Sequence, residues 1–205
     1  MLLKFFGLIA VVSVAMCLVP AGAHFFELAN KMSMSQPEYM TVQKIYAGWS
    51  FFGIAVITAL LITLIHTFMV RSDRMAFFLS LAAFLCLAAT QGIFWMFTYP
   101  MNVASNNWTV TPADFEVARR QWEYSHAVSA VLTFAAFVAI TLSVLATSRE
   151  ARRCTQTGLN GHWKKITPWH LADLKRSHAS GPSWRALEPF LCLPNDHRCR
   201  LRPAR

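Results

Sequence analysis

Four long apolar segments constrain this chain more than any other feature. They lie near residues 4–29, 45–70, 75–98 and 124–147 and consist almost continuously of Leu, Ala, Ile, Val and Phe. A helix needs about 20 apolar residues to cross a bilayer, and these segments lack the strict alternation of membrane barrel strands. The sequence therefore predicts an all-α protein in which residues 1–148 form a bundle of four transmembrane helices, with the lipid bilayer as its surroundings.

The net charge of +9 belongs almost wholly to the C-terminal part of the chain. Residues 1–148 hold seven Lys and Arg against six Asp and Glu, whereas residues 149–205 hold twelve against four. A nearly neutral bundle offers no basic surface for DNA or RNA, so we expect no nucleic-acid partner. Scattered Pro and Trp without helical periodicity predict that residues 149–205 form a largely disordered tail. The tail either binds anionic lipid through its basic groups or is a non-functional extension.

The basic residues of the connecting segments predict the orientation in the membrane. Lys4, Arg71, Arg74 and the arginines that follow the fourth segment all lie at one membrane face. By the positive-inside rule that face is cytoplasmic. We therefore expect an integral protein of the bacterial inner (plasma) membrane with both termini in the cytoplasm.

The first apolar segment has a second interpretation. Lys4, the apolar run of residues 5–19 and the small residues Ala21, Gly22 and Ala23 resemble a signal peptide with its cleavage site. Cleavage would leave three helices. The residues that follow, beginning with His24, are more typical of a helix that continues, and the interpretation with four helices is preferred.

Ionisable residues gather toward the outer ends of the first and fourth helices. His24 and Glu27 continue a polar stripe on the first helix, and Arg119, Glu123 and His126 share one side of the fourth. Charges are costly in lipid and usually face a partner or a cavity. The two His/Glu pairs are therefore predicted to meet. A buried ion pair or hydrogen-bond network is the first explanation.

A metal site is an alternative for the same residues. Glu-x-x-His spacing occurs in carboxylate-bridged metal sites of helical bundles, and here Glu123 and His126 have it in one copy only. A shared ion would require nitrogens of His24 and His126 at about 2.0–2.1 Å from it. We expect no metal and no cofactor. Trp49 and Trp108 are interpreted as anchors at the membrane interface, and His66 as an interfacial or helix-packing residue.

Pro100 is predicted to end the third helix, because proline lacks the N–H that continues the ladder and disfavours a helical residue before it. A long loop over residues 99–121 should follow, carrying Asn102, Trp108 and Arg120. Gln91, deeper in the third helix, is a secondary binding candidate because polar side chains bond across membrane helices.

Several short motifs together resemble one family of small four-helix membrane proteins, which includes the fungal anthrone oxygenases. The resemblance covers roughly residues 5–147 and excludes the tail. It is carried by His24-x-x-Glu27-x-x-Asn30-Lys31, Ile45-Tyr46-x-Gly48-Trp49, Thr90-Gln91-x-x-Phe94-Trp95, Tyr99-Pro100-x-Asn102, Asn107-Trp108 and Arg120-Gln121-Trp122-Glu123-Tyr124-x-His126.

The resemblance implies a cofactor-independent oxidation of an apolar, polyphenolic aromatic ketone to its quinone by molecular oxygen. His126 would be the base, Glu123 or Glu27 its orienting carboxylate, and Trp122 and Trp95 stacking walls. The oxygenases carry an Arg-His pair where this chain has Ser125, so Arg120 or Arg119 would hold the enolate instead. His24, Glu27, Gln91, Trp95, Asn102 and Trp108 would complete the binding site.

Two non-enzymatic functions remain open from the sequence. The protein is either a membrane scaffold, accessory subunit or small-molecule binder, or a metal-binding protein that uses the His/Glu pairs. An enzyme requires an open, partly apolar cleft beside His126. A scaffold should show the same residues paired and sealed.

Overall fold

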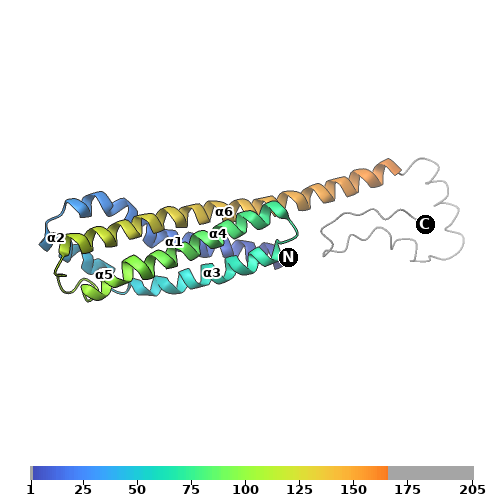
Figure 1. The fold of residues 1–205 in the computed structure, drawn as a ribbon. Coiled ribbons are helices and arrows are strands. Elements are labelled where there is room, and N and C mark those ends of the chain that lie inside the picture. The colour runs from blue at the N-terminus through green and yellow to red at the C-terminus, as the bar shows by residue number, and fades with distance from the viewer. Residues whose placement is uncertain (1, 166–205) are drawn as a thin grey trace, which may run out of the picture. The chain divides into compact units, whose positions relative to one another are not determined.

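A computed structural model describes the backbone of residues 2–165 and the side chains of residues 2–147. Every regular element within these residues is helical, which confirms the predicted all-α fold. Figure 1 shows the long helices α1, α3, α4 and α6 running alongside one another, with α2 and α5 at the same end. The elements are α1 (Leu2–Ser33), α2 (Gln36–Val42), η1 (Gln43–Tyr46), η2 (Trp49–Phe51), α3 (Phe52–Met69), α4 (Arg74–Ile93), η3 (Phe94–Thr98), α5 (Tyr99–Ala104) and α6 (Phe115–Lys165).

Within the described residues, four helical stretches are long and apolar enough to cross a membrane. Large apolar side chains such as Phe5, Ile57 and Phe134 lie exposed on their outer surfaces. In lipid such side chains are solvated by acyl chains, and a helix satisfies its own backbone groups. These features indicate an integral membrane protein. The stretches are Leu2–Ser33, Trp49–Met69, Arg74–Ala104 and Phe115–Thr147.

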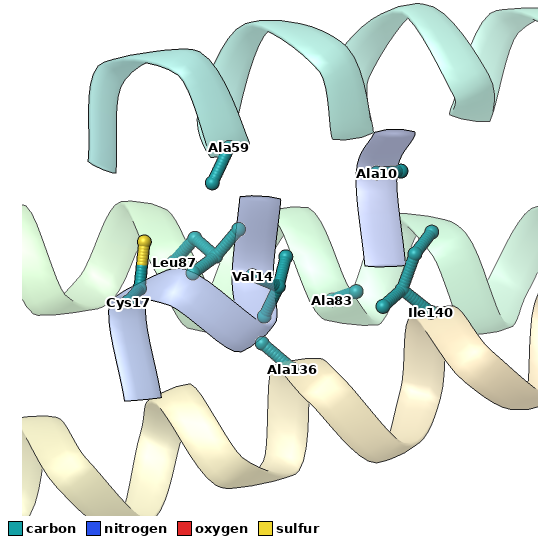
Figure 2. Packing of buried hydrophobic residues seen from close by; sticks show 8 residues of the cluster. All are labelled: Ala10, Val14, Cys17, Ala59, Ala83, Leu87, Ala136 and Ile140. Carbon is teal, nitrogen blue, oxygen red and sulfur yellow. The ribbon is translucent and has the colours of Figure 1, made fainter. Parts of the chain in front are cut away.

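Small side chains fill the middle of the bundle. Ala10, Ala59, Ala83 and Ala136 come from four different helices and are fully buried together (Figure 2). Small residues let helix backbones approach closely, which is how helices associate where lipid removes the hydrophobic driving force. Larger side chains of the same cluster, Val14, Cys17, Leu87 and Ile140, fill the spaces between them.

The prediction that Pro100 ends the third helix is wrong. After α4 the chain forms one π-helical segment, η3, in which the Tyr99 amide donates to the Phe94 carbonyl five residues earlier. Pro100 then lies in the first turn of α5, where a missing N–H costs little. A π turn shifts the hydrogen-bond register by one residue, so the helical stretch continues to Ala104 rather than ending at residue 98.

The last helix is longer than expected at both ends. It begins at Phe115, not at residue 124, which places Arg120 on the helix instead of in a loop. The connection between α5 and α6 is shorter than the predicted 99–121 loop for the same reason. The helix also continues past the expected end at 147 to Lys165, in a stretch without proline; the next proline is Pro168. The rest of the predicted tail, residues 166–205, lies outside the described residues.

Helix α1 passes without interruption through Pro20 and the small residues that resemble a cleavage site, and it ends at Ser33. Val14 and Cys17, which precede that site, belong to the packed core. The first segment therefore forms part of the bundle in this structure. Helix α1 therefore extends beyond its predicted end near residue 29, and it includes Lys31.

A short strap joins α1 to α3 and covers one end of the bundle. It consists of α2, η1 and η2, that is residues 36–51, and we refer to it as the strap. Ser35 precedes it, and its amide and hydroxyl both donate to the Glu38 carboxylate. Gly48 adopts a φ of 85° between η1 and η2, a left-handed conformation that glycine adopts without steric cost.

Candidate functional site

The candidate site is a group of polar and aromatic side chains where the strap meets α1 and α6; six of its nine members are buried, and Glu27, Tyr46 and His126 are half-buried. We call it the end cluster. Helix α1 contributes residues at positions i, i+3 and i+7, which share one face. The strap and α6 supply the rest. Its members are His24, Glu27 and Lys31 from α1, Tyr39, Gln43 and Tyr46 from the strap, and Trp122, Glu123 and His126 from α6.

An ion pair lies at the centre of the end cluster. The Lys31 Nζ is 2.6 Å from the Glu123 Oε1, and the two side chains are 1 % and 0 % exposed. The prediction of a buried ion pair at Glu123 is confirmed in kind, but the partner is Lys31 and not a histidine. Lys31 lies seven residues after His24 and so shares one face of α1 with it. The sequence did not predict this contact because the helix was predicted to end near residue 29, before Lys31.

Two tyrosines of the strap connect the ion pair to its surroundings. The Tyr39 hydroxyl donates to Glu123 Oε1 at 2.9 Å and accepts from Gln43 Nε2 at 2.5 Å. The Tyr46 hydroxyl donates to the Glu27 carboxylate and accepts from Lys31 Nζ at 3.3 Å. Glu27 and Glu123 are therefore joined through Tyr46 and Lys31.

Both phenols stay protonated near neutral pH. Burial, followed by the nearby Glu123 carboxylate, raises the pKa of Tyr39 well above its ordinary value of 10. Burial, followed by the hydrogen bond to Glu27, does the same to the pKa of Tyr46. Each hydroxyl thus remains a hydrogen-bond donor to a carboxylate.

The two histidines meet, as the sequence predicts. The rings of His24 and His126 are stacked with centroids 4.1 Å apart and an interplanar angle of 27°. Trp122 borders both rings, at 5.0 Å from His24 and 4.3 Å from His126. Its indole N–H donates to the Asn102 Oδ1 at 2.7 Å, and the Lys31 ammonium lies 4.6 Å from its ring centroid. The predicted candidates His24, Glu27, Asn102, Trp122, Glu123 and His126 thus lie in or beside the end cluster.

Stacked imidazoles do not suit a shared metal ion. An imidazole nitrogen binds a metal along its lone pair, which lies in the ring plane. Nearly parallel rings therefore point their lone pairs side by side rather than at one point. Within the described residues, no group of three or more His, Cys, Asp or Glu side chains is placed to hold an ion.

Trp108 is part of the aromatic packing around the cluster, so its interpretation as a membrane anchor is wrong. It is buried against Tyr39 at 5.2 Å and Trp122 at 5.6 Å between ring centroids. Asn106, Asn107 and Trp108 all have positive φ, and the Trp108 amide donates to Ser105 Oγ. This left-handed turn directs the indole inward. Trp49 lies half-buried, 5.7 Å from His24.

Three predicted candidates lie away from the centre of the cluster. Arg120 is exposed on α6, whereas its neighbour Arg119 is buried and binds the Met34 carbonyl and Glu116. Trp95 is 60 % exposed and packs on Phe94 and Tyr99. Gln91 donates to Thr90 of its own helix. The cation within the cluster is Lys31, a role for which the sequence pointed to Arg120 or Arg119.

Some buried polar atoms of the cluster have no hydrogen-bond partner among the described residues. They include His24 Nδ1, Glu123 Oε2 and Gln43 Oε1, with Trp108 Nε1 at its edge. Glu123 thus accepts through Oε1 alone, and it does not orient His126. Buried polar atoms are nearly always satisfied by protein, water or ligand, so these atoms leave hydrogen-bonding capacity for a bound molecule.

Among the described residues, a surface groove lies on the outside, between the end of α1 and the strap, and the end cluster does not line it. Its lining residues are Asn30, Ser33, Met34, Pro37, Glu38, Thr41 and Val42.

No protein-family model matches the chain, and no curated protein or solved structure does so either. The fold and the end cluster define a class: an integral membrane helical bundle with a charged, hydrogen-bonded group buried at one end. The resemblance to the anthrone oxygenase family stays a prediction.

Proposed function

We propose that the end cluster binds a small apolar molecule that carries an acidic phenol or enol oxygen. The observation that carries this proposal is the buried Lys31 ammonium over the Trp122 ring, which borders both histidine rings. Polar atoms of His24 and Glu123 have no partner among the described residues. A bundle that needed only stability could extend its small-residue core to this end. Buried ion pairs seldom add stability over apolar packing, and ionisable groups within membrane spans mark functional sites by default.

The chemistry that suits these groups is oxygenation without a cofactor, as the family resemblance implies. His126 removes a proton from the ring carbon of a phenolic ketone, and the Lys31 ammonium holds the resulting enolate oxygen. Molecular oxygen adds to the carbanion. One oxygen atom becomes the quinone carbonyl, and the other leaves as water with both hydrogens of the ring methylene. Trp122 supplies the aromatic wall, and Lys31 replaces Arg120 in the role of the cation.

The test is oxygen uptake and quinone formation by the purified, metal-stripped protein supplied with an anthrone-like phenolic ketone. We expect His126→Ala and Lys31→Met each to reduce kcat at least about 100-fold, the usual contribution of a positioned base or charge. Lys44→Met is the matched control, because Lys44 is exposed on the strap and outside the cluster. Full turnover in His126→Ala would contradict the role of the base.

A second candidate is a structural function without catalysis, and the pairing of the buried charges favours it. Lys31, Tyr39 and Glu123 are paired and buried, and the groove at this end lies elsewhere. In a membrane scaffold or accessory subunit the network would pin the strap and α1 to α6. Absence of turnover and of ligand binding, together with loss of stability in Lys31→Met, would favour this function.

For location we propose the bacterial inner membrane, with both termini and Arg71 at the cytoplasmic face and the end cluster at the outer face. The support is the position of the basic residues. The test is labelling of single cysteines, placed at Ser72 and at Asn107 in a Cys-free background, with a membrane-impermeant thiol reagent. In intact spheroplasts only the Asn107→Cys variant should react. Reaction of Ser72→Cys alone would reverse the orientation.

A further inference from the structure

The π turn η3 changes which residues of the third spanning stretch face the inside of the bundle. The buried residues of α4 recur at steps of four and three along one face: Ala76, Ser80, Ala83, Leu87 and Thr90. An uninterrupted α-helix would continue this face at residues 94, 97, 101 and 104. Instead Thr98 and Ser105 are 2 % and 0 % exposed, whereas Phe97 is 45 % exposed. The inward face is therefore displaced by one residue, which is the extra residue of a π turn.

This displacement turns three polar residues toward the bundle, and each forms a hydrogen bond there. The bonds are Thr98 Oγ1 with Ser125 Oγ at 2.7 Å, Ser105 Oγ with the Trp108 amide at 3.0 Å, and Asn102 Oδ1 with the Trp122 indole N–H at 2.7 Å. In an uninterrupted α-helix these places would belong to Phe97, Met101 and Ala104. The π turn thus exchanges an apolar face for a polar one next to the end cluster.

Asn102 selects the orientation of the Trp122 ring. An indole N–H only donates, so the Asn102 atom that faces it is the carbonyl oxygen. The χ2 torsion of a tryptophan is broad and roughly two-fold, and a flipped ring would direct its N–H away from this acceptor. Trp122 is 4 % exposed, so the N–H would then be buried without its partner, which is costly.

The selected orientation matters because the Trp122 ring borders the groups of the end cluster. Its centroid lies 5.0 Å from that of His24 and 4.3 Å from that of His126, and the Lys31 Nζ is 4.6 Å from it. We propose that Asn102 is a positioning residue, which fixes the Trp122 ring against the two histidines, and that η3 places it for this role. This inference rests on the function proposed for the end cluster, in which Trp122 is the aromatic wall.

The test is ¹H–¹⁵N NMR of tryptophan-labelled protein in nanodiscs, with Trp122→Phe to assign the Trp122 indole resonance. In Asn102→Leu we expect an upfield shift of the indole proton and loss of the cross-peaks between the Trp122 and His126 rings. Asn102→Asp keeps an acceptor oxygen at the same position and should restore both signals. Asn30→Leu is the matched control, because Asn30 is exposed on α1. Signals that Asn102→Leu leaves unchanged would overturn the proposal.

A second variant tests the π turn and alters no side chain of the end cluster. Deletion of Met96, which is 68 % exposed, removes the extra residue. An ordinary α-helix would then carry Asn102 on the buried face of α4, so the indole resonance and the cross-peaks should persist. Their loss in this variant would contradict the role given to η3.

Turnover distinguishes failure of this proposal from failure of the proposed function. With an anthrone-like ketone, Asn102→Leu should lower kcat about 10- to 100-fold, as expected for a misplaced group, and Asn102→Asp should recover most of that loss. An unchanged kcat in Asn102→Leu would overturn the positioning role. If the unmodified protein has no turnover, the oxygenase proposal fails, and the orientation of the Trp122 ring in the NMR experiment still decides the role of Asn102.

Discussion

Lys31 decides the character of the end cluster at the scale of single residues. Its ammonium contacts the Glu123 carboxylate and the Tyr46 hydroxyl, and it lies over the Trp122 ring. Removing water from two charges costs several kcal/mol per ion, and the attraction between the ions recovers that cost only with good geometry. The pair therefore matters most when one partner is lost, because the other charge then stays buried without compensation.

The first prediction compares single and double substitutions of this pair. Lys31→Met should destabilise the protein by about 3–5 kcal/mol, because Glu123 would remain buried and unpaired. Adding Glu123→Leu should recover most of that loss. The measurement is the free energy of unfolding in mixed micelles, with Lys44→Met as control. A double variant that is as unstable as the single one would show that the geometry, and not the unpaired charge, sets the cost.

A second prediction concerns the left-handed turn that directs Trp108 inward. A left-handed conformation costs roughly 1–2 kcal/mol for most residues and little for glycine. Asn107→Gly should therefore keep or slightly raise stability, whereas Asn107→Val should lower it by about 1–2 kcal/mol. Thermal unfolding of both variants provides the measurement. Equal stability of the glycine and valine variants would contradict the strained turn.

At the scale of elements, the strap holds the end cluster closed. It supplies Tyr39 and Tyr46, whose hydroxyls bond to charged groups of α6 and α1, and Gln43, whose amide donates to the Tyr39 hydroxyl. Its first helix starts at Ser35 with two bonds to Glu38, at 2.8 Å from the amide and 2.5 Å from the hydroxyl. The charges of Lys31 and Glu123 are thus enclosed, at 1 % and 0 % exposure, whereas Glu27, Tyr46 and His126 are half-buried.

These bonds predict a pH dependence of the strap. They hold the pKa of Glu38 below its ordinary value of 4.5. A carboxyl group whose pKa is lower in the folded state stabilises that state above its unfolded pKa, and the effect is lost as the pH falls through the folded pKa. The start of α2 should therefore loosen below about pH 4.5. Cα chemical shifts of residues 35–39 measure this, and Glu38→Gln should remove the pH dependence.

At the scale of the whole molecule, different interactions hold the helices together in the middle of the bundle and at its ends. Alanines bring the helices together in the middle, while buried polar groups fix α1 to α6 at one end and α3 to α4 at the other. Residues 1–146 form a compact unit by themselves. In the part of the chain that the structure describes, the four stretches that can span a membrane lie within residues 2–147.

Removal of the basic tail is predicted to leave this unit intact. Deletion of residues 155–205 should preserve membrane insertion and change the midpoint of thermal unfolding by less than about 4 °C, the shift expected for roughly 1 kcal/mol. Membrane fractionation and thermal unfolding in detergent are the measurements. A deleted protein that fails to insert would show that the tail takes part in folding. Weaker binding to anionic vesicles by the deleted protein would assign the tail a role at the lipid surface.

Much of the fold could be predicted from the sequence because lipid restricts which backbone structures can span it. Apolar length alone places the four spanning helices, since every backbone group in lipid must be bonded within its own helix. The meeting of His24 and His126 also follows from helix direction and spacing. Helix ends were less predictable. Pro100 predicts the end of the third helix, but a π turn before it allows the helical stretch to continue to Ala104.

The partners inside the end cluster were decided by tertiary structure. Glu123 could have paired with a histidine, an arginine or a lysine on sequence grounds, and it is the packing of the strap onto α1 and α6 that brings Lys31 to it and leaves Arg120 exposed. Spacing along one helix determines which side chains share a face. Which of them meet across helices depends on how the backbones approach, and that is set by packing distributed over the whole bundle.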